Sequence, residues 1–391
     1  MSHKTSRRKF LETALKAGVF LPFSSTVLYS CISKSSEKSI TEVNSSKKLK
    51  ILILGGTSFL GPHQVAYAVN RGHSVSIFTR GKTKPSIYKD VFAKVEQLIG
   101  DRANDLKALE NRKWDVVIDN SGRKVEWTKR SAALLKDNCD VYLYTSSTGV
   151  YYPYVNSAFK EDSKVVLSVP EDCKEEEKLE YDYGVMKANS ELAAIEQFGK
   201  DRTIVVRPTY MIGPSDRTNR FIHWPVRLEK GGEIMVPGKK EDAVQYVDVR
   251  DVAEWMIRLA EEKKAGTYNA VGPKEAQNMH AFISEAKKTF PVESSLVMID
   301  DYEFLKKNNI YYIVPWIMSS PSHIGSAKIN NQKALRNGLS FRTLKDSIKD
   351  TLAWWKSDAV SEERRKEFMT DPKSILMREE AIIKKWKALK E

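Results

Sequence analysis

The first clear hydrophobic pattern in the chain lies at 48–54, where a basic lead runs into an unbroken apolar stretch. A run of this kind is typical of a parallel strand that is buried on both faces. Alternating or apolar stretches then recur, with helical spacing between them. The predicted strands are 48–54, 73–79, 95–99, 115–118 and 141–145, and the predicted helices are 64–70, 104–110 and 127–136. Strands that alternate with helices predict an α/β fold with a doubly wound parallel sheet.

The turn after the first predicted strand has the sequence GGTSFLG, residues 55–61. Glycines between a strand and a helix let the chain bend tightly, let a pyrophosphate approach the backbone and let the helix pack on the strand. Ser58 occupies the middle position, where glycine is usual in a dinucleotide site. Because the N-terminus of the next helix would face the phosphates, we expect cofactor contacts from Gly55, Thr57, Ser58, Phe59, Leu60 and Gly61.

Two charged residues after later strands bear on the choice of cofactor. The second strand of a dinucleotide-binding fold normally ends in an acid that holds the adenosine ribose. Here that strand ends without an acid, and Arg80 follows. This arrangement tolerates a 2′-phosphate and favours NADP over NAD, although Arg80 is also compatible with stacking on adenine or with pointing into solvent. Asp101, after the third strand, is placed either to contact the adenine edge or to close a surface turn.

Two later stretches carry candidate catalytic chemistry: TSSTGVY, residues 145–151, and YGVMK, residues 183–187. Tyr183 and Lys187 are four residues apart and share a face of the predicted helix. A tyrosine with an ordinary pKa of about 10 is a poor base at neutral pH, but a cation beside it favours the phenolate. A hydroxyl from Ser147 would hold a substrate oxygen between itself and Tyr183. A solvated helix pair is the simpler alternative for Tyr183 and Lys187, but the order of glycine turn, serine cluster and Tyr-Lys helix makes the catalytic interpretation more specific.

With its motifs in this order, the chain resembles the extended short-chain dehydrogenase/reductase family, also called NAD-dependent epimerase/dehydratases. The resemblance covers roughly 48–355, and it depends on the stretches GGTSFLG, GDR, DVVIDNSG, TSSTGVY, YGVMK, VVRPTYMIGP and YVDVRDVAEWM. The glycine turn is most similar to that of an atypical branch with a GGTxFxG pattern.

The resemblance implies a role for each residue that matches a family motif. Tyr183 would be the catalytic acid/base, and Lys187 would bind the nicotinamide ribose and favour the Tyr183 phenolate. Ser147 would polarise the substrate, and Pro208 would lie beside the nicotinamide. The alternatives to Ser147 are its two neighbours, Ser146 and Thr148.

The resemblance also implies a Rossmann-type domain and a smaller C-terminal α/β substrate domain. We expect the first at 49–212, with some later segments returning to it, and the second mainly at 213–355. Residues 356–391 are charged and predict a helical C-terminal extension. Side chains in the second half either contact a polyol or acidic substrate or pack the domain; these are Arg217, Arg220, His223, Trp224, Tyr302, Phe304, Tyr311, Tyr312 and Trp316.

Residues 1–31 have the order of parts of an export signal. SRRKFL, residues 6–11, closely resembles the twin-arginine signal, and 17–29 is an apolar segment too short and too polar for a comfortable membrane span of about 20 residues. The following LYSC resembles a lipobox, in which Cys31 would be acylated and anchor the protein to a membrane. Residues 32–48 predict a flexible linker. Because the twin-arginine export machinery carries folded proteins, we expect a periplasmic or cell-envelope lipoprotein that travels with its cofactor bound.

Charge and cysteine content change this picture little. The net charge of +13 and the pI near 9.3 permit binding to RNA or to an anionic surface. No basic run with interleaved aromatics is present, however, and acidic patches such as 171–180 interrupt the basic ones, so a nucleic-acid partner is not expected.

Cys31, Cys139 and Cys173 lack metal-ligand spacing, so no metal site is predicted, and a bond between Cys139 and Cys173 is neither required nor excluded.

These observations lead to two hypotheses of different classes. The first is an exported NAD(P)-dependent oxidoreductase or epimerase with a tightly held cofactor, acting on a hydroxyl or carbonyl carbon of a saccharide. The periplasm holds no pool of free nicotinamide nucleotide or nucleotide sugar, which favours a closed catalytic cycle and a free or glycan-derived saccharide. The alternative is a non-catalytic member of the atypical branch that binds RNA or a glycan and needs neither Tyr183 nor Lys187.

Overall fold

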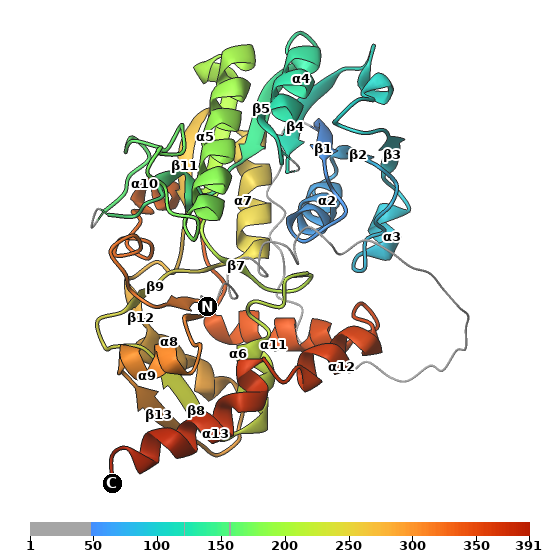
Figure 1. The fold of residues 1–391 in the computed structure, drawn as a ribbon. Helices are drawn as coiled ribbons and strands as arrows, with labels where there is room; N and C mark the ends of the chain where they lie inside the picture. The colour runs from blue at the N-terminus through green and yellow to red at the C-terminus, as the bar shows by residue number, and fades with distance from the viewer. Residues whose placement is uncertain (1–47, 121, 156–157) are drawn as a thin grey trace, which may run out of the picture.

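The computed structural model describes residues 48–120, 122–155 and 158–391, and a seven-stranded sheet lies at its centre (Figure 1). Every pairing in this sheet is parallel, and the strand order is β11-β6-β5-β4-β1-β2-β3. The order extends in both directions from β1, so the predicted doubly wound sheet is confirmed. The strands are β1 (Lys50–Leu54), β2 (Ser74–Thr79), β3 (Glu96–Ile99), β4 (Trp114–Asp119), β5 (Cys139–Thr145), β6 (Thr203–Pro208) and β11 (Gly266–Ala270).

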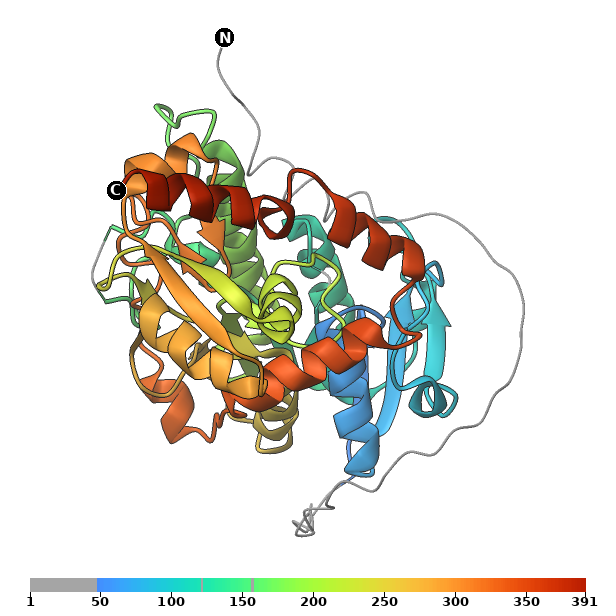
Figure 2. The ribbon, with the colours of Figure 1, turned by 90° about the horizontal axis from the view of Figure 1, so that it is seen from below.

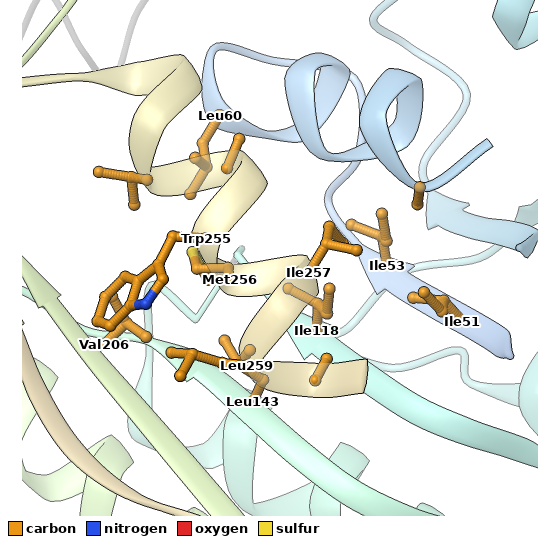
Figure 3. Close-up of a cluster of buried hydrophobic side chains, with 14 of the residues drawn as sticks. Ile51, Ile53, Leu60, Ile118, Leu143, Val206, Trp255, Met256, Ile257 and Leu259 are labelled. Atoms are coloured by element: carbon orange, nitrogen blue, oxygen red, sulfur yellow. The ribbon is translucent and has the colours of Figure 1, made fainter. Parts of the chain in front are cut away.

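Helices cover both faces of the sheet, because successive strand residues point to opposite sides and both sides are apolar. On β1, Ile51 and Ile53 belong to a cluster with two helices, α2 and α7, whereas Leu52 and Leu54 belong to a cluster with α4 and α5. Figure 3 shows the first cluster, with Met256 of α7 among side chains of the sheet. The covering helices are α2 (Leu60–Asn70), α7 (Val249–Glu261), α4 (Val125–Leu135) and α5 (Lys178–Phe198).

Much of the second half of the chain, apart from α7 and β11, forms a smaller layer below the sheet in Figure 1. Its core contains Phe304 and Trp316, so packing accounts for these two aromatics. Two parallel strands, β8 (Gly232–Pro237) and β13 (Ser294–Ile299), lie within it. The helices around them are α6 (His223–Lys230), α8 (Met279–Ala286), α9 (Tyr302–Lys307), α11 (Leu344–Lys356) and α13 (Ile375–Ala388).

Short elements complete the part of the chain that the structure describes. They are α3 (Lys89–Phe92), α10 (Gln332–Arg336), α12 (Glu362–Thr370), β7 (Met211–Ile212), β9 (Ala243–Val244), β10 (Val247–Asp248), β12 (Gln277–Asn278), β14 (Tyr312–Ile313), β15 (Trp316–Ile317), and the 3-10 helices η1 (Lys107–Leu109), η2 (Thr148–Tyr151), η3 (Lys200–Arg202) and η4 (Lys287–Thr289). Within the described ranges, no helix combines the length and the apolar character that crossing a bilayer requires.

The predicted helix at 104–110 is wrong, because only η1 forms there. The backbones of Asp101 and Asp105 hydrogen-bond to each other in a turn before it. The Asp105 carboxylate then accepts the Lys107 N–H at 3.2 Å, and a side chain that caps the backbone in this way competes with the helical hydrogen-bond pattern. Asn111, with a φ of 57°, ends the segment before a second helical turn can form.

A buried ion pair ties the C-terminal helix to the smaller layer. Figure 2 shows this helix, α13, in dark red along that layer. Arg227 of α6 binds Glu379 of α13, and their side chains are 7% and 4% exposed. Glu379 also accepts the Met235 N–H at 2.8 Å, and Arg227 donates to the Gly231 carbonyl at 2.6 Å. Burial raises the pKa of Glu379 against the opposing effect of Arg227, so the carboxylate depends on the arginine for its charge.

We expect Arg227→Met to lower the free energy of unfolding by about 3–5 kcal/mol, because the buried Glu379 carboxylate loses its charge partner. The double variant Arg227→Met/Glu379→Gln should recover most of that loss, since glutamine keeps an acceptor for Met235 and carries no charge. Urea denaturation followed by circular dichroism measures both values. Equal stability of the single and double variants would show that the unpaired charge is not the cause.

Candidate active site

The glycine turn after β1 lets the first turn of α2 approach the strand. A Cβ atom on Gly61 would lie 2.6 Å from the carbonyl carbon of Gly56, and a Cβ on Gly56 would lie 2.7 Å from the Ile77 side chain of β2. Gly55 has a φ of 88°, which favours glycine. Gly56 and Gly61 therefore allow close contacts that a Cβ would block, and Gly55 allows a positive φ in the turn.

The amino end of α2 is suited to an anion. Its N-cap residue, Phe59, makes no side-chain capping hydrogen bond, and no acidic residue lies in the first turn. Thr57 is half-buried, Ser58 is exposed and Leu60 is buried. Backbone N–H groups and the positive end of the helix dipole at such a terminus favour a phosphate. The turn therefore fits the pyrophosphate of a dinucleotide.

Arg80 and Asp101 lie beyond the carboxyl ends of β2 and β3, at the edge of the sheet from which the glycine turn also leaves. Arg80 is exposed. The carboxylate of Asp101 accepts the Ala103 N–H at 2.9 Å. Asp101 therefore closes a local turn, which was the alternative to a contact with the adenine edge. Contacts of either residue with a cofactor stay predictions.

Ser147 and Tyr183 both lie close to the backbone of Gly149. A Cβ atom on Gly149 would lie 3.0 Å from Cδ1 of Tyr183 and 3.3 Å from Oγ of Ser147. The Ser147 hydroxyl accepts the Gly149 N–H at 3.0 Å and caps η2, which fixes its place after β5. The Tyr183 side chain is 37% exposed. The segment after β5 and the first turns of α5 thus bring the Ser147 hydroxyl beside the ring of an accessible tyrosine.

Lys187 follows Tyr183 by one helical turn on α5 and is buried, with 7% exposure. Its Nζ donates to the Thr145 carbonyl at 2.9 Å and lies 5.1 Å from the centre of the Tyr144 ring. Burial lowers the pKa of Lys187, but attraction to Tyr144, Tyr183 and Asp119 outweighs burial and raises the pKa above its ordinary value. Lys187 therefore carries a positive charge at neutral pH.

Asp119, at the end of β4, supplies negative charge near Lys187, and the sequence did not single it out. Its side chain is fully buried, binds Arg102 and accepts the Tyr142 hydroxyl at 2.7 Å. Burial alone would raise the pKa of Asp119, but the charge and hydrogen bonds of Arg102 hold the pKa below its ordinary value. A permanent carboxylate thus stabilises the buried ammonium of Lys187.

The structure separates Ser147 from its two neighbours in the serine cluster. Ser146 is 3% exposed and donates to Glu191. Thr148 is 6% exposed and donates to the carbonyl of Pro208, the buried last residue of β6, at 3.4 Å. Both hydroxyls are engaged inside the protein, which leaves Ser147 as the one beside Tyr183.

An ion pair that the sequence analysis missed lies behind the serine cluster. Glu191 on α5 and Arg207 on β6 are joined by two hydrogen bonds, of 2.9 and 2.6 Å. The available signals were an acid four residues after Lys187, on the same helix face, and an arginine directly before Pro208.

Residues that open the second half mostly make contacts within the protein. Arg220 lies 3.6 Å from Asp216, and the His223 and Trp224 rings are 4.9 Å apart. Burial, together with the Arg227 charge, lowers the pKa of His223 to about 3, so this histidine is neutral at physiological pH. Ring packing is therefore observed for His223 and Trp224 and an ion pair for Arg220, while the buried Nε2 of His223 and Nε of Arg220 have no hydrogen-bond partner among the described residues. Cys139 and Cys173 are free thiols, and Cys31 lies outside the described residues.

A relative and two solved structures resemble this chain. The "Chloroplast stem-loop binding protein of 41 kDa b, chloroplastic" of Arabidopsis thaliana is 28% identical over 249 residues, which are 59% of this chain and 61% of the plant protein. The match thus spans less than two thirds of the plant protein.

UDP-N-acetylglucosamine 4-epimerase from Methanobrevibacter ruminantium M1 is 15% identical over 79% of this chain and 98% of its own, with a TM-score of 0.57. UDP-glucuronic acid 4-epimerase from Bacillus cereus is 17% identical over 78% of this chain and 98% of its own, with a TM-score of 0.53.

At these identities the two solved structures show a shared fold. The family evidence comes from the sequence: the model of the NAD dependent epimerase/dehydratase family matches residues 51–271. This range is more than half of the chain, and it contains the glycine turn, Ser147, Tyr183 and Lys187. The chain therefore belongs to the NAD dependent epimerase/dehydratase family.

Proposed function

We propose that the protein is an NAD(P)-dependent oxidoreductase or epimerase that acts on a hydroxyl or carbonyl carbon of a saccharide or related small molecule. The proposal depends on one observation: Ser147 and Tyr183 lie around Gly149, and the buried cation Lys187 follows Tyr183 by one helical turn, at the sheet edge that also bears the glycine turn. Ligands of open α/β sheets bind at this edge, where the strand order reverses. Here the order reverses between β1 and β4.

The turn and the strand ends would hold the dinucleotide. The pyrophosphate would lie against residues 55–61, the adenosine near Arg80 and Asp101, and the nicotinamide ribose near Lys187 with Pro208 beside the ring. We favour NADP, because no acid ends β2 and Arg80 follows it. NAD is the alternative, and the structure of the Bacillus cereus epimerase is a complex with NAD.

A bound nicotinamide would accept or donate a hydride. The residues of this chain would handle the proton: Tyr183 would take a proton from the substrate hydroxyl or return it, with the positive charge of Lys187 one helical turn away. Ser147 would donate a hydrogen bond to the same substrate oxygen. The exposure of Tyr183 supports this division, since the proton-transferring group must reach the substrate while the cation need not.

A saccharide substrate is supported by the solved structures of similar fold, one of which is a UDP-N-acetylglucosamine 4-epimerase in complex with UDP-N-acetylmuramic acid. Export would separate this protein from cytoplasmic nucleotide sugars and from free nicotinamide cofactor. We also propose that the protein is exported, because residues 6–31 resemble an export signal. The cofactor would then be held tightly, a closed cycle would restore it, and the substrate would be a free or glycan-derived saccharide.

A second candidate function is nucleic-acid binding without catalysis. It is favoured by the name of the plant relative, a stem-loop binding protein, and permitted by the pI of 9.3. A binder of this kind has no use for a buried ammonium beside an accessible tyrosine. We therefore place it second, and binding of a structured RNA that is unaffected by Tyr183→Phe, in a protein without cofactor, would favour it.

The first test is the cofactor itself. Protein expressed without its leader, purified and denatured should release about one dinucleotide per chain, identified by absorbance and mass spectrometry. Gly61→Ala should release much less, since its Cβ would clash with the Gly56 backbone. Gly199→Ala, at a positive-φ position with no neighbouring atom within 4 Å, is the control for a glycine change remote from the turn. Wild-type protein that neither releases a dinucleotide nor binds one when supplied would overturn the proposal.

The second test removes the proton-transferring hydroxyl. Tyr183→Phe should lower turnover by about 10²–10⁴-fold while the dinucleotide stays bound. Turnover is measured with a panel of free saccharides and UDP-sugars, by near-ultraviolet absorbance of reduced nicotinamide and by NMR of the products. Tyr181→Phe is the matched control, because Tyr181 is buried on the same helix against Tyr152, 4.7 Å between ring centres. Equal losses in both variants would contradict a specific role for Tyr183.

The third test concerns export. The signal that would direct it, in residues 1–31, lies outside the described residues. Arg7→Lys/Arg8→Lys should hold the protein in the cytoplasm, and Cys31→Ser should abolish incorporation of labelled fatty acid without blocking export. Lys16→Arg is a control within the leader but outside the motif. Fractionation by osmotic shock, followed by immunoblotting, measures the distribution. A wild-type protein found wholly in the cytoplasm would contradict the export proposal.

A further inference from the structure

We propose that Glu191 and Arg207 are positioning residues, which set the place of the nicotinamide-facing segments relative to the Tyr183–Lys187 helix. The inference rests on the proposed function, because it presumes that Ser147, Pro208 and Lys187 surround the nicotinamide end of a cofactor. Neither residue is required to touch cofactor or substrate. We call the pair and its partners the brace: Ser146, Tyr151, Glu191, Arg207 and Asn269.

The pair at the centre of the brace is buried and held by two hydrogen bonds. Arg207 Nε lies 2.9 Å from Glu191 Oε1, and Nη2 lies 2.6 Å from Oε2, with side chains 6% and 5% exposed. Parallel hydrogen bonds of this kind fix the relative orientation of two planar groups as well as their distance. Burial lowers the pKa of Arg207, but Glu191 outweighs burial and raises the pKa, so the guanidinium stays charged.

The brace joins three segments at the residues next to the proposed site. Glu191 lies one helical turn after Lys187 on α5. It accepts the hydroxyl of Ser146, which directly precedes Ser147. Arg207 directly precedes Pro208, and the Ser146 N–H donates to the Val206 carbonyl at 2.7 Å. A displacement of either member therefore moves the backbone that carries Ser147, Pro208 or Lys187.

The outer part of the brace fixes Arg207 from the opposite side. Arg207 Nη1 donates to the Tyr151 hydroxyl at 2.7 Å, and that hydroxyl donates to the Asn269 amide oxygen at 2.8 Å. Tyr151 belongs to η2, the 3-10 helix that Ser147 caps, and Asn269 belongs to β11, the neighbour of β6. The hydrogen-bonded chain thus runs from α5 through β6 to β11 and also reaches the segment that positions Ser147.

Stability alone is a poor explanation for this arrangement. A buried ion pair commonly contributes little net stability relative to uncharged side chains of similar volume, because desolvation offsets the attraction. The pair instead fixes the position of α5 relative to β6, since both hydrogen bonds are lost if the two elements shift relative to each other. The pair at Arg207 has the same chemistry as Arg227–Glu379, but the latter lies on α6 and α13, in the smaller layer.

The test uses these two pairs as matched variants, with NADH and NADPH as the probes. Arg207→Met/Glu191→Gln removes both charges of the brace, and Arg227→Met/Glu379→Gln makes the identical change in the remote pair. Ser146→Ala cuts only the hydrogen bond to Glu191 and leaves the ion pair, so it stays informative if the brace double variant fails to fold. Urea denaturation shows which variants are folded, and fluorescence reports both the dissociation constant and the emission of bound reduced nicotinamide.

We expect the brace double variant to bind the reduced cofactor within about threefold of wild type. The reason is that the glycine turn and α2 follow β1, and neither contains a residue of the brace. Its nicotinamide emission yield should differ at least twofold from wild type, and Ser146→Ala should change it in the same direction. The remote double variant should match wild type in emission. A merely structural role would give both double variants the same emission as wild type.

The outcomes separate this inference from the function on which it rests. If wild-type protein neither retains a dinucleotide through purification nor binds NADH or NADPH, the proposed function fails. If wild type binds the cofactor and both Ser146→Ala and the folded brace double variant keep the wild-type emission, the brace proposal is overturned while the proposed function stands. An equal change in the remote double variant would also overturn it, because the effect would then not be specific to the brace.

Discussion

The close contact between α2 and the turn after β1 is the constraint on which the rest of the structure depends. It exists only because Gly61 has no Cβ, which would otherwise lie 2.6 Å from the Gly56 backbone. Once α2 is seated there, it packs with α7 over one face of the sheet, and His63 on α2 lies 3.1 Å from the Pro214 carbonyl at the entry to the smaller layer. The same contact aims the N-terminus of α2 at the sheet edge where the candidate catalytic residues gather.

A series of buried charges provides the second level of organisation. Arg102 pairs with Asp119, Arg207 with Glu191 and Arg227 with Glu379, and each pair joins two different segments of the fold. Hydrophobic contacts between strands and helices tolerate small sliding movements, because they have no direction. A charged hydrogen bond has a preferred distance and angle, so these pairs add directional contacts to the apolar layers.

The sequence predicted the parts of the fold and site that depend on local pattern. The apolar strands and the glycine turn follow from side-chain periodicity and from steric needs that act within a few residues. The helix at 104–110 failed because Asp105 caps the backbone, an effect that composition does not reveal. The resemblance favoured Ser147 and left Ser146 and Thr148 as alternatives. Their partners distinguish them: Ser146 donates to Glu191 and Thr148 to the Pro208 carbonyl, both more than 40 residues away. Asp119 and Arg207 were missed because the partners that give them a role, Lys187 and Glu191, lie on other elements of the fold.

In the candidate site, Tyr183 is exposed to solvent and Lys187 is buried. A lysine in water would have its field weakened by solvent and salt, whereas a buried ammonium acts on its neighbours with much less screening. Burial of this charge is possible because Asp119 and the Tyr144 ring stabilise it from inside the protein. The tyrosine, in contrast, stays accessible beside the Ser147 hydroxyl. The charge thus acts from the protein side, while Tyr183 is the member of the pair that solvent can reach.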